Sequence, residues 1–323
     1  MSELTKSLWP SLPYAAWRDT ADTLHLWTQI VGKIRLSRTP WLNHSWHVPL
    51  YVTARGLSTS LIPFGSRTFD IEFDFNAHQL EISVTTGERR QVALRPRTVA
   101  DFHAQVLSSL TELGIPVTIN DYPCEISGAI RFPLDQDHAT YDAAYANRFW
   151  RALVQIEHVF QTFRTGFVGK CSPVHFFWGS FDLAVTRFSG RAAPPYKGTT
   201  PGVAAEVMRD AYSHEVSSAG FWPGGNGADD AAFYSYAYPT PDGFRESPIQ
   251  PAGAYFGEEL GMFLLPYDVV RTSGNPEHAL LAFLQSSFEA TANSARWDRA
   301  SMECPQGVPG VPRATAGPEG RRS

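Results

Sequence analysis

Apolar residues recur three or four positions apart in several segments, which places them on one face of a helix. The clearest segment runs from Phe149 to Phe167, where six apolar side chains form one continuous stripe. The same spacing occurs in three other long segments and in one short one. The pattern predicts helices in residues 19–36, 98–114, 149–168, 203–211 and 275–295.

Residues that favour helix starts precede three of these segments. Asp19 or Thr20 can cap the first helix, because short polar side chains accept hydrogen bonds from the free backbone N–H groups of the first turn. Thr98, with an aspartate three residues on, resembles a capping box. Asn275 followed by proline is the favoured cap and first position of the last helix.

Strict alternation of apolar and polar residues marks the strand Phe69–Phe75, with one apolar face and three carboxylates on the other. Other runs rich in β-branched and aromatic residues also read as strands. They are residues 41–54, 80–85, 91–94, 169–191, 212–219, 233–238 and 260–265.

The two halves of the chain share an order of elements: a helix ending in Val-Gly-Lys, then strands, then a closing helix. Lys33 and Lys170 occupy the two Val-Gly-Lys runs and are two of only four lysines. This order favours the α+β class, with two similar halves, each an antiparallel sheet flanked by helices, as an internal duplication would produce. His47 and His175 would then correspond.

The expected organisation has four parts. Residues 1–114 form an N-terminal α+β half, 115–137 a connector, and 138–299 a C-terminal α+β half with insertions. Residues 300–323 are rich in proline, glycine and arginine, and we expect this tail to be disordered.

The composition of the chain limits the classes of partner that we expect. Charged residues make up 18% and aromatics 13%, and 27 cationic against 32 anionic residues give a net charge of −5 without a basic run. We therefore expect no nucleic-acid partner, which would need a cationic stripe. Apolar runs are too short for a membrane span, and three widely spaced cysteines form no CxxC. We expect a soluble, reduced, cytoplasmic protein without a membrane partner; the oligomeric state is not indicated.

Residues 169–191 concentrate chemically useful side chains in a run that otherwise has the pattern of a buried strand or hairpin. On a regular strand, His175 would share one face with Phe177, and Trp178 would share the other with Asp182. Arginine forks commonly hold carboxylates or phosphates, so Arg187 and Arg191 are candidate anion clamps beside Lys170 and Asp182. An internal ion pair between Asp182 and Arg187 is the alternative.

Four histidines raise the alternative of a divalent metal. His44 and His47 are separated by two residues, and with His175 or His214 and a carboxylate they could complete a three-ligand site with an open position. The spacing lacks the helical HExxH frame. A hydrogen-bonded structural histidine beside tryptophan is the other interpretation.

Glu215 is the candidate carboxylate partner of the histidines. On a regular strand, however, it points away from the face that carries His214. The alternative is that Glu215 pairs with an arginine near solvent. Trp222, which begins a glycine-rich loop ending at Gly227, and Trp178 are candidate walls of a cleft.

The runs SPVHFFWGSFDLAVTRFSGR (172–191) and AYSHEVSSAGFWPGG (211–225) resemble a bacterial family recorded only as a domain of unknown function. The resemblance extends from Trp9 to about Arg299. It implies no activity, cofactor or catalytic residue.

Three functional hypotheses follow. The first is a protein that binds a small, anionic organic molecule in an aromatic cleft lined by histidine and arginine; an enzyme is favoured over a pure binder. Its acid–base groups are His175, His47 and Glu215, its ligand contacts Lys170, Asp182, Arg187 and Arg191, and its walls Trp178 and Trp222. The second is a metal-dependent enzyme. The third is a non-catalytic scaffold, which a closed core around Trp178, His175 and Trp222 would favour.

Overall fold

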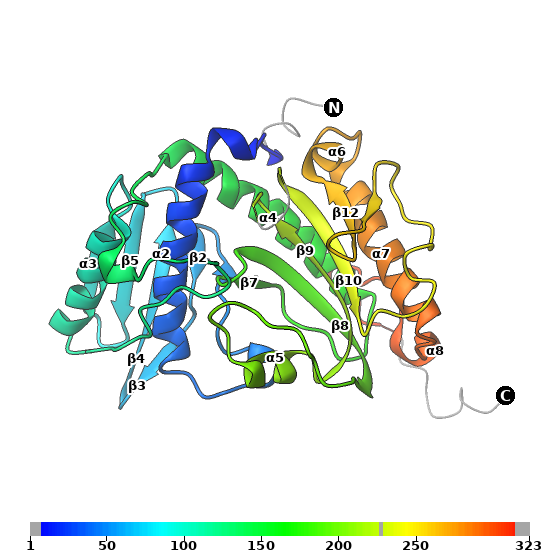
Figure 1. Ribbon diagram of the computed structural model, residues 1–323, viewed down its shortest axis with the longest axis horizontal. Helices are drawn as coiled ribbons and strands as arrows, with labels where there is room; N and C mark the ends of the chain where they lie inside the picture. Colours follow the sequence, from blue (N-terminus) through cyan, green and yellow to red (C-terminus); the bar gives the residue numbers. More distant parts are fainter. Residues whose placement is uncertain (1–7, 226–228, 314–323) are drawn as a thin grey trace.

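The computed structural model describes residues 8–225 and 229–313, and it confirms the α+β class in two similar halves. Each half holds an antiparallel six-stranded sheet flanked by helices (Figure 1). The first half contains η1 (Tyr14–Ala16), α2 (Arg18–Leu36), η2 (Asn43–Ser45), β1 (Tyr51–Val52), β2 (Gly56–Ser58), β3 (Ile62–Phe64), β4 (Arg67–Asp74), β5 (Gln79–Val84), β6 (Arg89–Ala93) and α3 (Val99–Glu112).

The second half begins after a long connector. It contains η3 (Phe132–Leu134), α4 (Ala143–Thr165), β7 (His175–Phe177), β8 (Asp182–Ala192), α5 (Ala205–Ala211), β9 (His214–Trp222), β10 (Ala232–Tyr238), β11 (Tyr255–Gly257), β12 (Met262–Pro266), α6 (Tyr267–Arg271), α7 (Pro276–Ser294) and α8 (Arg299–Met302). The strand order is β1-β2-β4-β5-β6 in the first sheet, with β3 also on β4, and β11-β12-β10-β9-β8-β7 in the second.

The two sheets meet edge to edge at Leu50 and Phe176. These residues exchange both backbone hydrogen bonds, each with an N···O distance of 2.9 Å, and both are fully buried. Reciprocal bonding of this kind is the hydrogen-bonded pair of an antiparallel ladder. It places the end strand of each sheet against the other sheet, so that neither of these two edges is left unpaired here.

The Val-Gly-Lys runs are not structurally equivalent. Lys33 lies inside α2, whereas Lys170 follows the end of α4 by five residues. His47 precedes the first residue of β1 by four positions, whereas His175 is itself the first residue of β7. The similarity of the halves is therefore one of element order, and the expected correspondence of His47 with His175 is wrong.

Two of the three predicted helix caps are confirmed. The Thr98 hydroxyl accepts a hydrogen bond from the Asp101 N–H at 3.1 Å, and Asn275 does the same for His278. The prediction for α2 is wrong, because this helix begins at Arg18 without a side-chain cap. The N-cap position is occupied by the buried Trp17, whose ring packs on Phe149 of α4.

The predicted disordered tail begins too early. Residues 299–302 form α8, and Glu303 pairs with Phe167 in an isolated bridge. The last carbonyl groups of α4 need partners, and the Gly166 carbonyl just beyond the helix accepts a hydrogen bond from the Cys304 N–H at 3.1 Å. The expectation of disorder is thus wrong for residues 300–304, and residues 314–323 lie outside the described part.

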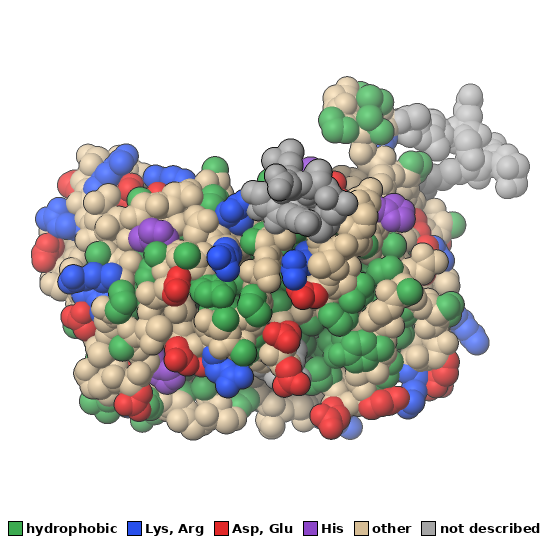
Figure 2. All heavy atoms as spheres, turned by 90° about the horizontal axis from the view of Figure 1, so that it is seen from above, with side chains coloured by type: hydrophobic (Ala, Val, Ile, Leu, Met, Phe, Trp, Pro, Cys, Tyr) green, Lys and Arg blue, Asp and Glu red, His purple; other side chains and the backbone are tan. Residues whose placement is uncertain are grey.

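The distribution of charged side chains on the surface and the apolar content of the helices can be compared with the sequence-based expectations. On the face shown in Figure 2, lysine and arginine side chains lie among aspartate and glutamate side chains instead of gathering into one patch. None of the described helices is both long enough and apolar enough to cross a membrane.

The Thr98 cap allows a direct test of local stability. We expect Thr98→Ala to lower the free energy of unfolding by about 1 kcal/mol, because the Asp101 N–H loses its acceptor. Urea denaturation followed by circular dichroism measures this change. Thr98→Ser keeps the acceptor and should stay close to the wild type; equal losses for both variants would show that the hydroxyl is not what matters.

Candidate functional site

A pocket of about 610 Å³ lies on the face of the second sheet that α4 and α7 leave open. Its floor is formed by β7–β10, and its other walls come from η2, Cys124 and Glu125 of the connector, α5 and the last turn of α2. Aromatic side chains dominate the lining. They are Trp41, Trp46, Phe177, Trp178, Phe188, Tyr196, Tyr212, Trp222, Tyr234, Tyr236 and Tyr238.

Strand alternation decides which side chains reach the pocket. On β8 the even-numbered residues from Asp182 to Phe188 line it, and on β10 the three tyrosines do so. Odd-numbered residues such as Val185 and Phe233 point to the side covered by the helices. His175 pairs with Ala184 and Phe177 with Asp182, so these four residues share one face.

The expected separation of His175 and Asp182 onto opposite faces is therefore wrong. The turn between β7 and β8 has four residues, 178–181, and Phe181 adopts a left-handed conformation with φ of 56°. A turn interrupts the two-residue alternation, so parity counted from His175 along the sequence does not extend to β8.

Hydroxyl groups form a polar strip across the aromatic floor. The Thr186 Oγ1 and Ser218 Oγ atoms are 2.9 Å apart, and the hydroxyl oxygens of Tyr212 and Tyr236 are also 2.9 Å apart. Burial raises the pKa of Tyr212 well above its usual value, so its hydroxyl stays protonated. The strip thus offers neutral donors and acceptors rather than charges.

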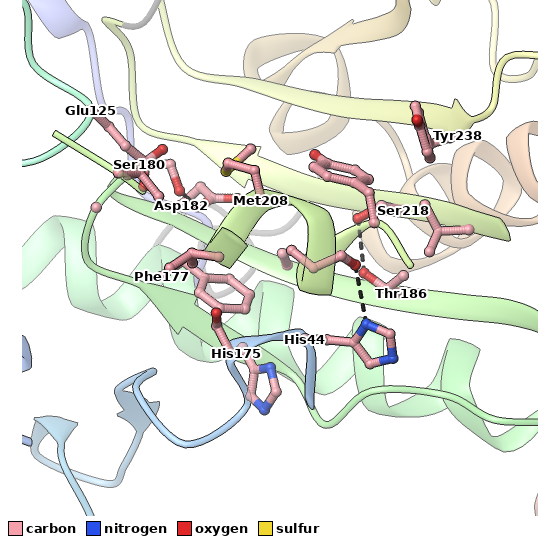
Figure 3. A pocket seen from close by; sticks show the side chains of 18 of the residues that line it. His44, Glu125, His175, Phe177, Ser180, Asp182, Thr186, Met208, Ser218 and Tyr238 are labelled. Atoms are coloured by element: carbon pink, nitrogen blue, oxygen red, sulfur yellow. Dashed lines mark hydrogen bonds between the residues drawn. The ribbon is translucent and has the colours of Figure 1, made fainter. Parts of the chain in front are cut away.

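Two carboxyl groups lie together at one end of the pocket (Figure 3). Asp182 is 4% exposed and accepts hydrogen bonds from the hydroxyls of Ser180 and Tyr234. Burial raises the pKa of Asp182 to about 6, although both hydrogen bonds oppose the shift. Desolvation, and then the charge of Asp182, raise the pKa of Glu125 to about 7.

Glu125 occupies an unusual position. It lines both this pocket and a second cavity of about 360 Å³. Protein therefore surrounds the residue while much of its side-chain surface remains accessible. Its backbone is left-handed, with φ of 61°, and a Cβ atom at Gly179 would lie 2.1 Å from its Oε1 atom. A side chain at position 179 would therefore force the carboxyl group of Glu125 to move.

Trp178 closes the pocket beside α2. Its indole N–H donates a hydrogen bond to the Val48 carbonyl at 2.9 Å. A Cβ atom at Gly32 would lie 2.2 Å from the indole ring, so only glycine lets the ring pack on the helix. The Lys33 ammonium lies 5.8 Å from the centre of the same ring.

His175 is fully buried in an aromatic cage. Its ring lies 5.3–6.0 Å from the rings of Trp46, Tyr51 and Phe177, and neither of its nitrogens has a hydrogen-bond partner among the described residues. Burial, with Arg35 and Arg164 nearby, lowers its pKa to about 3. The imidazole is therefore neutral near pH 7 and has no proton to give as an acid.

The other three histidines do not join His175. His44 contacts the Ala211 carbonyl through Nδ1 and the Lys170 ammonium through Nε2, at 3.1 and 2.6 Å. His47 accepts a hydrogen bond from the Leu42 N–H, and the rings of His214 and His44 are 5.8 Å apart. The described residues contain no group of three or more His, Cys, Asp or Glu side chains that could hold a metal ion. The described residues therefore do not form the expected three-ligand site of His44 and His47 with His175 or His214 and a carboxylate.

Arg187 lies on the helix side of the sheet and cannot clamp a ligand in the pocket. Its guanidinium is 3.5 Å from the ring centre of Phe163 and 4.3 Å from that of Phe288. It donates one hydrogen bond to the Phe163 carbonyl, and its Nε and Nη1 atoms have no partner in the described part of the chain. The expected ion pair with Asp182 is also wrong.

Glu215 and Arg191 pair with each other instead of serving the pocket. The Arg191 guanidinium donates to Glu215 at 2.6 and 2.8 Å and to the Ala295 carbonyl. Glu215 also accepts a hydrogen bond from Ser189. The alternative that gave Glu215 an arginine partner is correct. Lys170 lies behind the pocket wall, over the rings of Trp46 and Phe188.

Several pocket residues were not singled out from the sequence. The tyrosines of β10 occupy alternate positions, 234, 236 and 238, which is a readable signal of one shared strand face. Thr186 and Ser218 follow from the same periodicity on β8 and β9. Glu125 and Lys33 had no local signal, because one lies in a connector and the other inside an apolar helix pattern. The glycine-rich loop is described only to Gly225, so Gly227 lies outside the described residues.

The fold and the pocket together define an α+β protein with a ligand-sized aromatic pocket on one open sheet face. The chain belongs to a family of unknown function, DUF5996, whose model matches residues 9–304. This confirms the expected family membership. None of the curated proteins and none of the solved structures compared with the chain matches it.

Replacement of Arg187 tests whether its charge or its packing among the phenylalanines contributes to stability. We expect Arg187→Met to unfold within about 1 kcal/mol of the wild type, because a buried charge without a carboxylate partner adds little net stability. Arg187→Ala leaves a cavity among the phenylalanines and should lose about 2–4 kcal/mol. Thermal and urea unfolding measure both. Strong destabilisation by Arg187→Met would contradict this interpretation.

Asp182 should make stability depend on pH. The pKa of Asp182 is about 6 in the folded chain, compared with the ordinary aspartate value of 3.8 that applies to the unfolded chain. The folded state therefore binds the proton more tightly. The resulting stability is fully present below about pH 4 and is lost as the pH rises through about 6. We expect Asp182→Asn to gain up to about 3 kcal/mol relative to the wild type between about pH 4 and pH 8. Urea unfolding at both pH values measures it.

The control for this pH effect is the exposed Asp229→Asn. It should leave the difference in unfolding free energy between the two pH values unchanged. Parallel pH profiles for the wild type and Asp182→Asn would contradict the raised pKa of Asp182.

Proposed function

We propose that the pocket binds a small, largely apolar organic molecule with hydrogen-bonding groups, and that the protein is an enzyme acting on it. A volume of about 610 Å³ lies within the roughly 300–1,000 Å³ usual for small-molecule sites. Phe177, Tyr236 and Trp222 keep accessible surface although protein surrounds them. Such surface suits the body of an organic ligand.

The observation that best supports binding of a small molecule is the polar strip in the aromatic floor. Three neighbouring strands place Asp182, Thr186, Ser218 and Tyr236 on the same open face, where a closed core would hold apolar side chains. Thr186 lines the pocket and keeps part of its surface accessible. A ligand that lies on the strip would exchange water for these hydroxyls.

Acid–base chemistry favours an enzyme over a carrier. An efficient general acid or base has a pKa near the working pH, and the raised pKa of Asp182 meets that condition. Asp182 is therefore a better candidate for the acid–base group than His175, whose imidazole is buried and neutral near pH 7. The reacting group of the ligand would lie at the end of the pocket that holds Asp182 and Glu125.

The arginines do not favour an anionic ligand. The guanidinium groups of Arg187 and Arg191, the expected anion clamps, are both engaged outside the pocket. The scaffold hypothesis depended on a closed core around Trp178, His175 and Trp222, whereas all three line the pocket. A small-molecule site is thus the better supported hypothesis.

A fragment screen by ligand-observed NMR tests the proposal. We expect fragments with an aromatic body and a hydroxyl or carbonyl group to bind the wild type. Thr186→Val keeps the shape and removes the hydroxyl, so affinity for these fragments should fall about tenfold, the value of one buried hydrogen bond.

The matched control is Thr162→Val on α4, outside the pocket lining. It should bind the fragments as the wild type does. Fragments that bind Thr186→Val as tightly as the wild type, or a complete absence of pocket-binding fragments, would contradict the proposed site.

A further inference from the structure

Lys33 places an amine in the wall of the pocket. It lies in the last turn of α2, is 6% exposed, and is one of the lining residues of the pocket. The long side chain therefore leaves the helix toward the pocket instead of toward bulk water. No other lysine of the described chain lines this pocket.

The Lys33 ammonium has no negative counter-charge. No described carboxylate lies within ion-pair distance of it, and its neighbours are the Trp178 ring and the Cys124 thiol. Burial raises the pKa of Cys124 to about 11, so this thiol is neutral near pH 7. An unpaired buried ammonium is unfavourable, and burial accordingly lowers the pKa of Lys33.

The surroundings of Lys33 are held in place. Gln29, one turn earlier on α2, accepts from the Cys124 N–H and donates to its carbonyl, both at 2.9 Å. Trp178 is fixed by its bond to Val48 and by its contact with Gly32. These contacts keep water-excluding groups around the amine, the environment that makes a lysine nucleophilic.

We propose that Lys33 is the nucleophile that forms a Schiff base with the carbonyl group of a small aldehyde or ketone bound in this pocket. The inference rests on the proposed function, because it uses the same pocket. The neutral Nζ attacks the carbonyl carbon and forms the N–C bond of a carbinolamine. The carbinolamine hydroxyl then takes up a proton and leaves as water, which gives the C=N bond.

The proton for the leaving water can come from the same pocket. Asp182 and Glu125 have raised pKa values and are partly protonated near neutral pH. Both N–H protons leave the amine in these steps. One moves to the former carbonyl oxygen and departs in the water, and the other passes to solvent or to a carboxylate, which replaces the proton taken up by the leaving hydroxyl. No electrons are gained or lost, so no external oxidant or reductant is needed. The product of the step is an imine and one water molecule.

The other lysines differ from Lys33. The Lys170 ammonium is bonded to His44 Nε2 at 2.6 Å, and Lys197 is exposed. Lys6 lies outside the described residues. With only four lysines in the chain, chemical trapping can be assigned to one of them by peptide mass spectrometry.

The experiment is reductive trapping of the full chain with 2-naphthaldehyde and sodium borohydride. We expect one naphthylmethyl group on Lys33, and protection by an excess of 2-naphthalenemethanol, the matched alcohol that cannot form an imine. Lys33→Arg keeps a charge without a nucleophilic amine and should lose the label, while Lys197→Arg should keep it. Circular dichroism of both variants verifies folding.

Two outcomes are informative against the proposal. If the alcohol binds in the pocket and Lys33 stays unlabelled, the Schiff-base role is wrong and the proposed binding function stands. If the label spreads over Lys170 and Lys197 or persists in Lys33→Arg, the reaction is non-specific and Lys33 is not the nucleophile. Failure of the alcohol to compete for saturable binding would instead count against the proposed function. Lys33→Met, which removes the amine and the charge, must behave as Lys33→Arg in labelling.

Discussion

The alternation of side chains along β8, β9 and β10 is the constraint on which the site depends. Helices α4 and α7 cover one face of the second sheet, so every second residue of these strands is committed to a core. The remaining residues face the other way and form the pocket floor. A shift of one residue in the pairing of β8 and β9 would bury Thr186 under α4 and turn Arg187 into the pocket.

This constraint explains why residues adjacent in sequence have unrelated roles. Thr186 offers its hydroxyl to the pocket, while Arg187 lies among phenylalanines on the opposite side. Ser218 and Glu215 likewise lie on opposite faces of β9, and Glu215 binds Arg191 near the surface. Chemical side chains that cluster in the sequence thus separate into a pocket set and a structural set.

Close contacts with glycine shape the rest of the pocket. Gly32 lets Trp178 pack on α2, and Gly179 makes room for the carboxyl group of Glu125. The Lys33 side chain then lies beside a fixed indole ring, and none of the described carboxylates forms an ion pair with it. Larger residues at these two glycines would displace Trp178 or the carboxyl group of Glu125. The shape of the pocket wall therefore depends on the lack of a side chain at both positions.

Much of the architecture could be predicted from the sequence, because long periodic segments report which face is buried. The α+β class, the long helix α4 and the caps at Thr98 and Asn275 are of this kind. Parity across the turn before Asp182 could not be predicted, since a four-residue turn with left-handed Phe181 resets the alternation. Glu125 and Lys33 reach the pocket only through tertiary packing, which no local pattern records. The repeated Val-Gly-Lys was misleading because one copy lies inside a helix and the other lies after one.

The central claim is that the open face of the second sheet holds a small organic molecule. The most direct measurement is a crystal structure of the full chain soaked with a mixture of aromatic alcohols. The structure described here predicts electron density over Thr186 and Tyr236, between the rings of Phe177 and Trp222. A pocket closed by rearranged side chains, or density found only on other surfaces, would contradict the claim.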